Sequence, residues 1–350
     1  MQVVQKVVMT GQAATRYGSI PEALACAPCN ETDTVLVSAP IGHTTGLLIG
    51  FMAVLNQAVW ILTQPLLGLQ ETAQVVKEHK VTWAFVISSQ LLRICEGMRR
   101  MGERMESVRR IAVGGGPLSQ SAYNAAFDAF GNLESISNIY GMTESGRITF
   151  APAMRCGTDL GFPAPLVEVK VVDPVFYEKL GANQTGEIWF RGPTVMLGYY
   201  KHSEETIEFF DSDGWGKTGD AGYYDKNGRF FFVQRLKEMI KCMENQVAPA
   251  ELEELLLQEH PEDIAEVAVV GLADPRYGEA PAAAVVPKDK KMIVDHSDFR
   301  ERIQATIAEN MAVHKHLYGG VFLFDSLPKN EIGKVNRSAL VQKIAATTPS

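Results

Sequence analysis

Short β-rich runs alternate with helical stretches between Thr34 and Gly141, and this alternation constrains the fold more than any other feature of the sequence. Runs rich in valine, isoleucine and aromatic residues, such as Trp83–Ile87, are typical of buried strands. The stretches between them, such as Leu69–His79, carry apolar residues at helical spacing. Strands that alternate with helices at this spacing predict βαβ units around a parallel sheet. The other elements expected in this region are Val35–Ala39, Gly46–Leu55, Ala58–Leu62, Ser89–Arg99, Val108–Val113 and Ser119–Phe130.

The pattern changes after Phe150, where short strands punctuated by glycine predict a small antiparallel sheet or barrel. Beyond Arg235, the order helix, strand, strand, helix, strand, helix is compatible with a small α+β domain. The sequence therefore predicts an α/β fold with a large N-terminal body, residues 1–234, and a mobile C-terminal lid, residues 235–350. Residues 151–234 form a β-rich subdomain of that body. The strands expected in the subdomain are Val167–Val172, Gly186–Phe190 and Gly228–Val233.

The charge balance argues against one class of function. The formal net charge is −8 and the sequence has no basic face, whereas nucleic-acid binding needs clustered lysine and arginine to neutralise phosphates. The most apolar stretch, Thr45–Leu62, is interrupted by Asn56 and Gln57, so we expect it to be buried and expect no transmembrane segment. The N-terminus lacks the features of a secretory signal, and the C-terminus lacks a peroxisomal signal of the Ser-Lys-Leu kind. These features favour a cytoplasmic location.

Four segments carry side chains suited to nucleotide chemistry. Asn138–Ser145 follows a predicted strand and supplies an aromatic ring for a purine, a hydroxyl for a phosphate oxygen and a carboxylate for Mg²⁺. Trp215–Asp220 places one carboxylate in a predicted tight turn, where it could accept hydrogen bonds from two ribose hydroxyls. Arg235–Lys241 brings three cations to the predicted domain boundary, and Pro328–Lys334 places a lysine after a glycine on a loop. Taken singly, each segment is more typical of an ordinary turn or a solvated loop.

Together and in this order, the four segments resemble those of the adenylate-forming superfamily, which includes acyl-CoA synthetases, 4-coumarate–CoA ligases and beetle luciferases. The long match Gln246–Glu253 supports the resemblance, as do Arg191-Gly192-Pro193 and Gly198-Tyr199. The resemblance extends from about Lys6 to Ile344 and is greatest to the luciferase and coumarate-ligase branch.

This resemblance implies a two-step reaction. A carboxylate, from a fatty or aryl acid, attacks the α-phosphate of ATP in the presence of Mg²⁺, giving an acyl-adenylate and pyrophosphate. The small domain then rotates, and coenzyme A attacks to form the thioester. The expected partners are therefore small molecules: the carboxylic acid, ATP and coenzyme A. The residues that the resemblance assigns to nucleotide binding are Gly114, Gly115, Gly116, Pro117, Asn138, Tyr140, Gly141, Thr143, Asp220 and Arg235.

The resemblance also implies individual roles. Thr143 would contact the α-phosphate, and Glu144 would hold the magnesium ion. Lys334 would be catalytic, since a flexible point charge can stabilise the negative charge that builds on the phosphorus and the acyl oxygen. His43 would lie at an aromatic gate beside the carboxylate, with a buried structural histidine as the alternative interpretation.

The sequence departs from the family pattern in several places. The phosphate loop rich in serine, threonine and glycine is absent, because Lys6–Gln12 resembles the segment that follows this loop. At the hinge, Gln234 replaces the usual aspartate. In the lid, close to Lys241 and the thioester channel, Glu244 replaces a usual glycine and adds bulk and negative charge. We therefore expect activity to be impaired in this chain. Arg147 stands where luciferases carry a small residue, which makes light emission a weak alternative.

A second alternative is a non-catalytic adenylate-binding or interaction protein derived from an acyl-CoA synthetase. The missing first subdomain is expected to leave apolar helix faces such as Leu47–Leu55 exposed, so that the chain needs a partner or aggregates. The family resemblance also leaves a peroxisomal location open.

Overall fold

The computed structural model describes residues 8–9, 29–37, 39, 41, 43–61, 68–151, 158–293, 297–329 and 335–347. The chain divides into two compact units, residues 1–232 and residues 233–350. The division lies between Phe232 and Val233, close to the predicted boundary after residue 234. The α/β class predicted from the sequence is confirmed.

The first unit is organised around a seven-stranded sheet of order β3-β2-β4-β5-β6-β7-β8. The first five strands are parallel, and β7 pairs antiparallel with both β6 and β8. Each of four helices connects two successive parallel strands. The strands are β2 (Thr34–Val37), β3 (Val59–Ile61), β4 (Trp83–Ile87), β5 (Arg110–Gly114), β6 (Ser135–Met142), β7 (Gly146–Phe150) and β8 (Phe162–Pro163). The helices are α3 (Thr44–Leu55), α4 (Leu69–His79), α5 (Ser88–Met101) and α6 (Gln120–Ala129).

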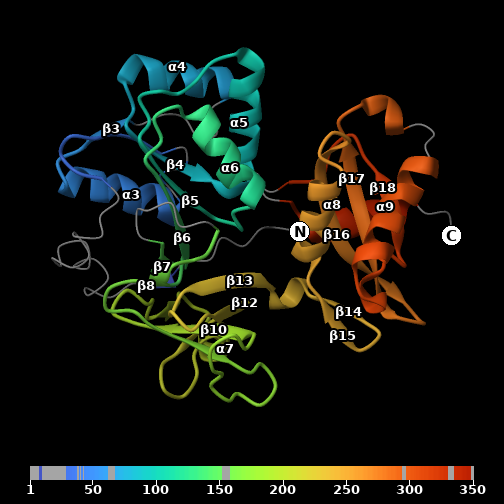
Figure 1. Ribbon diagram of the computed structural model, residues 1–350. Coiled ribbons are helices and arrows are strands. Elements are labelled where there is room, and N and C mark those ends of the chain that lie inside the picture. Colours follow the sequence, from blue (N-terminus) through green and yellow to red (C-terminus); the bar gives the residue numbers. More distant parts are fainter. Residues whose placement is uncertain are drawn as a thin grey trace. The chain divides into compact units, whose positions relative to one another are not determined.

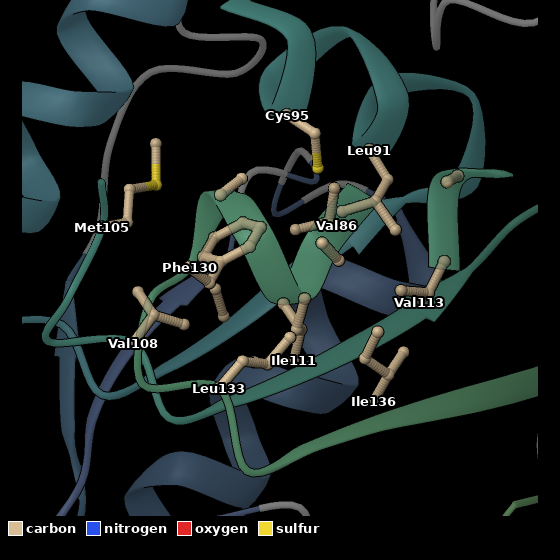
Figure 2. Packing of buried hydrophobic residues seen from close by; sticks show 14 of the residues in the cluster. Val86, Leu91, Cys95, Met105, Val108, Ile111, Val113, Phe130, Leu133 and Ile136 are labelled. Atoms are coloured by element: carbon tan, nitrogen blue, oxygen red, sulfur yellow. The ribbon is translucent and has the colours of Figure 1, made fainter. Parts of the chain in front are cut away.

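Both faces of this sheet are apolar because side chains alternate along each strand. On β4, Ala84 and Val86 pack with α4, α5 and α6, whereas Trp83, Phe85 and Ile87 belong to the cluster on the α3 side. Figure 1 shows α4, α5 and α6 on one side of the sheet and α3 on the other. Figure 2 shows the larger cluster, in which side chains from the sheet interdigitate with those from α5 and with Phe130.

Asp33, one residue before β2, joins the starts of three neighbouring strands. It is buried, accepts hydrogen bonds from the backbone N–H of Asn30 (2.8 Å) and from the Thr82 hydroxyl (2.8 Å), and pairs with Arg110. Thr82 lies just before β4, and Arg110 is the first residue of β5. Burial alone would raise the pKa of Asp33, but the hydrogen bonds from Asn30, Thr82 and Arg110 outweigh it, and the pKa is lowered.

The first unit also contains a two-stranded sheet of β1 and β11 and a four-stranded sheet of order β13-β12-β10-β9, whose strand β13 runs on past the division at Phe232. Strand β10 pairs antiparallel with β9 and with β12. The elements are β1 (Val8–Met9), β9 (Glu168–Val172), β10 (Gly186–Arg191), β11 (Gly198–Tyr199), α7 (Ser203–Phe209), β12 (Gly216–Tyr224) and β13 (Phe230–Arg235).

The second unit is α+β, with a sheet of order β15-β14-β17-β16 in which β18 pairs parallel with β17. Helices α8 and α9 pack on one face, and α10 packs on the other. Alternation again assigns the faces, since Val269 belongs to the first cluster and its neighbours Ala268 and Val270 to the second. The elements are η2 (Leu236–Glu238), β14 (Ile240–Cys242), β15 (Asn245–Val247), α8 (Pro249–Glu259), β16 (Ile264–Asp274), β17 (Gly278–Pro287), η3 (Lys290–Ile293), α9 (Ser297–Asn310), η4 (Val313–Lys315), β18 (Gly320–Leu323) and α10 (Arg337–Thr347).

A two-residue turn joins β14 to β15, because Cys242 pairs with Asn245 across the hairpin. Both turn residues adopt the left-handed conformation, with φ of 52° at Met243 and 62° at Glu244. This geometry suits the right-handed twist of a hairpin, but it favours asparagine and glycine over residues with longer side chains. The glycine that the family pattern places at position 244 therefore has a conformational reason.

We expect Asp33→Asn to lower the free energy of unfolding by roughly 2–3 kcal/mol at pH 7, because Arg110 loses a buried charged partner. The lowered pKa means that Asp33 contributes fully above its ordinary pKa of 3.8, and that this contribution is lost as the pH falls through the folded value. Urea unfolding between pH 7 and pH 3 should therefore give free energies of unfolding for the wild type and Asp33→Asn that become equal only at the acid end. Glu31→Gln, at an exposed neighbour, is the control. A difference that does not depend on pH would contradict the assignment.

Glu244→Gly should raise the free energy of unfolding of the second unit by about 1 kcal/mol, because glycine adopts a positive φ without steric cost. Gln246→Gly, in the extended strand β15, should instead be destabilising by about 0.5–1 kcal/mol. Urea titrations followed by circular dichroism would measure both variants. Equal losses of stability in the two would show that the left-handed turn is not strained.

Candidate functional site

The glycine segment Gly114–Pro117 lies at the carboxyl end of β5, beside the end of β4. The hydroxyl of Ser88, the first residue of α5, donates to the carbonyl oxygens of Gly114 (3.1 Å) and Gly116 (2.7 Å). The single hydroxyl hydrogen is shared between these two acceptors and holds the segment in place, while Gly115, Gly116 and Pro117 remain exposed. The carboxyl edge of a parallel sheet is where α/β folds commonly bind ligands.

The segment that begins at Asn138 is itself part of strand β6, which extends to Met142, and does not merely follow a strand as expected. Asn138 is buried, and its amide nitrogen donates to the carbonyl oxygens of Thr158 and Asp159, both at 3.1 Å. Gly141 allows β7 to approach, since a Cβ there would lie 2.1 Å from the carbonyl oxygen of Gly146. Asn138 therefore fixes the path of the chain after β7, and Gly141 fixes the start of β7.

Tyr140 and Asp220 are brought together, although 80 positions separate them in the chain. The Tyr140 hydroxyl donates to Oδ2 of Asp220 at 2.7 Å. Tyr140 lies on β6 of the large sheet and Asp220 on β12 of the four-stranded sheet. The hydrogen bond therefore places an aromatic ring and a buried carboxylate side by side where the two sheets meet.

Asp220 lies in a bulge within strand β12, and the expectation of a tight turn at this residue is wrong. Between the pairs Glu187↔Ala221 and Trp189↔Lys217, three residues of β12 lie opposite one residue of β10. Gly219 supplies the positive φ of 69°. The buried carboxylate of Glu187 accepts from the Gly219 N–H (2.9 Å) and from the Trp189 indole (2.8 Å). A bulge of this kind changes the direction of a side chain, and here it points Asp220 toward Tyr140.

The turn after β6 carries Thr143, which is exposed, and Glu144, which is buried. The Glu144 carboxylate accepts a hydrogen bond from the Tyr199 hydroxyl at 2.7 Å, and the Glu144 carbonyl accepts from the N–H of Met196, also at 2.7 Å. Burial, followed by the hydrogen bond to Glu144 and the charge of Glu144, raises the pKa of Tyr199. The segment before α7 thus holds both the backbone and the side chain of Glu144.

The donor set around Glu144 fits a magnesium ion that brings most of its own ligands. No group of three or more histidine, cysteine, aspartate or glutamate side chains in the described part of the chain could hold a metal ion. Mg²⁺ bound with a nucleotide typically uses one or two carboxylates together with phosphate oxygens and water. A single buried carboxylate beside an exposed threonine is compatible with that mode.

His43 caps the N-terminus of α3, where its Nδ1 accepts a hydrogen bond from the N–H of Thr45 at 3.2 Å. Its ring is half-buried. This capping contact gives His43 a structural role whether or not it also faces a substrate. Leu48, on the same helix, lies 3.7 Å from the position that a Cβ of Gly146 would occupy, so α3 borders the turn that carries Glu144.

The remaining predicted residues lie at or beyond the end of β13. Arg235 ends this strand, and the amide of the buried Gln234 donates to Glu238 (3.1 Å). Lys241 is exposed on β14, and Glu244 is exposed in the hairpin turn. Lys334 lies outside the described residues.

Arg337, the first residue of α10, was not among the site residues predicted from the sequence. It bonds to Glu238 (3.2 Å), Glu253 (2.8 Å) and the carbonyl oxygen of Val269 (2.5 Å). Burial alone would lower the pKa of Arg337, but the carboxylates of Glu253 and Glu238 raise it. Because Glu238 also binds Gln234, Arg337 ties the start of α10 to the predicted hinge segment within the second unit.

Tyr199 and Glu187 were also missed as members of the site. Gly198-Tyr199 belongs to the matching motifs, but a sequence gives no reason to pair Tyr199 with Glu144. Glu187 follows Gly186 in a strand-like run, where a glutamate is most simply read as solvent-facing. For Glu187 the available signal was the apolar run Ile188–Phe190 that follows it, since a polar residue within a buried strand needs a partner.

No helix in the described residues has the length and apolar character needed to span a membrane.

Comparison with known proteins gives the site a family context. Residues 5–200 match the AMP-binding enzymes, and residues 251–334 match the AMP-binding enzyme C-terminal domain. The chain is 35% identical over 315 residues to 4-coumarate–CoA ligase-like 2 of Arabidopsis thaliana, an alignment that covers 88% of this chain and 54% of that protein. It is 38% identical over 243 residues to luciferin 4-monooxygenase of Photuris pensylvanica, covering 68% and 43% respectively. The chain thus spans only about half the length of these relatives.

Solved structures show the same fold. The O-succinylbenzoate coenzyme A synthetase of Bacillus subtilis in complex with AMP superimposes with a TM-score of 0.79 at 26% identity, covering 96% of this chain and 66% of that one. ATP-bound MatB from Rhodopseudomonas palustris gives a TM-score of 0.84 at 24% identity, covering 97% and 65%. With matching regions that include more than half of its length, the chain belongs to the AMP-binding enzymes of the adenylate-forming superfamily.

Proposed function

We propose that the protein activates a carboxylic acid with ATP to an acyl-adenylate and then transfers the acyl group to coenzyme A. The observation that carries this proposal is the hydrogen bond between Tyr140 and Asp220, which places an aromatic ring and a carboxylate together at the carboxyl edge of the sheet. An adenosine group needs both: a face for its base and an acceptor for its ribose hydroxyls. The family relationship supports the same assignment.

In this proposal each residue acts on one part of the nucleotide. Gly114–Pro117 and Tyr140 bind the adenine, Asp220 accepts from the ribose hydroxyls together with Arg235, and Thr143 donates to the α-phosphate. A magnesium ion held by Glu144 would neutralise phosphate charge. The acid oxygen attacks the α-phosphorus and pyrophosphate leaves, with Lys334 stabilising the negative charge in the transition state. The coenzyme A thiol then loses its proton, attacks the acyl carbon and displaces AMP.

The apolar surroundings of the site favour a fatty or aryl acid over a short polar one. Leu48 lies against Gly146, beside the turn that carries Thr143 and Glu144. Leu48 is itself 44% exposed, so apolar surface beside this turn faces solvent. A hydrocarbon chain or aromatic ring in this region would remove such surface from water, with a gain of about 25 cal/mol per Å².

A second candidate is an adenylate-binding protein that does not complete the thioester step. Glu244 favours it, because this exposed carboxylate occupies a turn position where the family pattern has glycine, near where the resemblance places coenzyme A. The negative charge would oppose an anionic cosubstrate. Gln234 adds to this, because it replaces the hinge aspartate and bonds to Glu238.

The two candidates differ in turnover, and both require AMP binding. Under the first, the chain should catalyse acid-dependent exchange of pyrophosphate into ATP when fatty and aryl acids are supplied. Under the second, calorimetry should detect AMP binding, while pyrophosphate exchange and thioester formation stay at background. Asp220→Asn should weaken AMP binding about 10–100-fold in either case, because hydrogen bonds to a charged acceptor are lost. Asp173→Asn, at an exposed turn, should bind normally. Unchanged AMP affinity in Asp220→Asn would overturn the adenosine assignment.

The exposed stripe on α3 generates a prediction about association. Leu47, Phe51 and Val54 follow helical spacing and are 54%, 51% and 59% exposed. We propose that this face drives self-association or takes a partner. Light scattering should then give a mass well above the 38.4 kDa of one chain, and Leu47→Lys with Val54→Lys should reduce it. Val313→Lys, at an isolated exposed residue of the second unit, is the control. A monodisperse wild-type monomer would contradict the proposal.

A further inference from the structure

Glu144 is held by a segment to which the proposed mechanism assigns no role. The Tyr199 hydroxyl donates to Oε1 of Glu144 at 2.7 Å, and the Met196 N–H donates to the Glu144 carbonyl at 2.7 Å. Glu144 is 6% exposed and Tyr199 8% exposed. The contact is therefore a shielded hydrogen bond to a carboxylate and does not belong to the weakly held surface pairs.

Tyr199 is itself rigidly supported. Its N–H donates to the Thr206 hydroxyl at 2.9 Å, and its ring packs edge-on against Phe209, with centroids 5.9 Å apart. The ring also belongs to a buried cluster with Ile148 and Phe190. With backbone and ring both fixed, the hydroxyl has little freedom, so that it can impose an orientation on the carboxylate.

We propose that Tyr199 is a positioning residue for Glu144, and that its hydroxyl orients the carboxylate for the divalent cation that accompanies ATP. This inference rests on the proposed function, because the cation is expected only if the site takes a nucleoside triphosphate. A carboxylate that supplies few of the metal ligands gains most from being held in one orientation, and in the described residues it does not belong to a group of three or more histidine, cysteine, aspartate or glutamate side chains that could hold a metal. Hydrogen bonds that orient a metal ligand typically change metal affinity by about 10–100-fold.

The test separates metal affinity from nucleotide affinity. Tyr199→Phe removes the hydroxyl and keeps the ring that packs against Phe209. Mn²⁺ titrated into chain and ATP, and followed by electron paramagnetic resonance, should bind the protein–ATP complex about tenfold more weakly in this variant. AMP affinity without metal, measured by calorimetry, should stay within twofold of the wild type. Near-ultraviolet circular dichroism verifies the fold.

Two further variants make the result specific to Glu144. Tyr224→Phe removes a half-buried hydroxyl that donates to the Leu180 carbonyl oxygen at 3.3 Å, and it should leave Mn²⁺ affinity unchanged. Glu144→Gln should weaken Mn²⁺ binding by itself, and adding Tyr199→Phe to it should cause no further loss. An additional loss in the double variant would show that Tyr199 does not act through Glu144.

The outcomes distinguish this inference from the proposed function. Wild-type Mn²⁺ affinity in Tyr199→Phe would overturn the inference and leave the proposed function standing. Equal losses of Mn²⁺ and AMP affinity would also overturn it, since a merely structural tyrosine would disturb both. If the wild-type chain binds neither AMP nor Mn²⁺ with ATP, the proposed function fails and the inference fails with it.

Discussion

Two hydrogen bonds from tyrosine hydroxyls to carboxylates join the parts of the first unit that form the candidate site. They run in opposite directions. Tyr140 on the large sheet donates to Asp220 on the four-stranded sheet, whereas Tyr199 on β11 donates to Glu144 in the turn after β6 of the large sheet. A phenol can serve in this way because its ring is anchored by packing while its hydroxyl reaches a polar partner. The bulge in β12 has the same purpose, since it brings Asp220 within reach of Tyr140.

Periodicity was enough to predict the parallel sheet and its connecting helices, because burial on both faces of a parallel sheet leaves a strong pattern. Helix Leu69–His79 and strand Trp83–Ile87 have the bounds expected from the sequence. The prediction was wrong at Asp220, where two nearby glycines are typical of a turn. Pairing with β10 and the buried carboxylate of Glu187 instead keep this stretch within a strand. The local preference for a turn was overridden by tertiary contacts that the neighbouring sequence does not reveal.

The candidate site divides in the same way. Tyr140, Glu144 and Asp220 could be selected because they stand in motifs whose order resembles a family, although their roles stay predictions. Tyr199 and Arg337 could not, because their importance lies in partners 55 and 84 positions away. A half-buried arginine shared by two carboxylates looks, in the sequence, like any charge at the start of a helix. Only the tertiary structure shows that its desolvation is offset by Glu238 and Glu253.

The length of chain enclosed by the two tyrosine–carboxylate hydrogen bonds also bears on how the protein folds. Closing segments of 80 and 55 residues costs more conformational entropy than forming a helix or a neighbouring βαβ pair, and it is therefore slower. A chain that had formed only its parallel sheet would have Tyr140 and Glu144 in place without their hydrogen-bond partners Asp220 and Tyr199. Formation of the site therefore reports docking of the second sheet onto the first. A ligand held by both sheets would selectively stabilise the docked state, and in this sense the nucleotide would act as a folding cofactor.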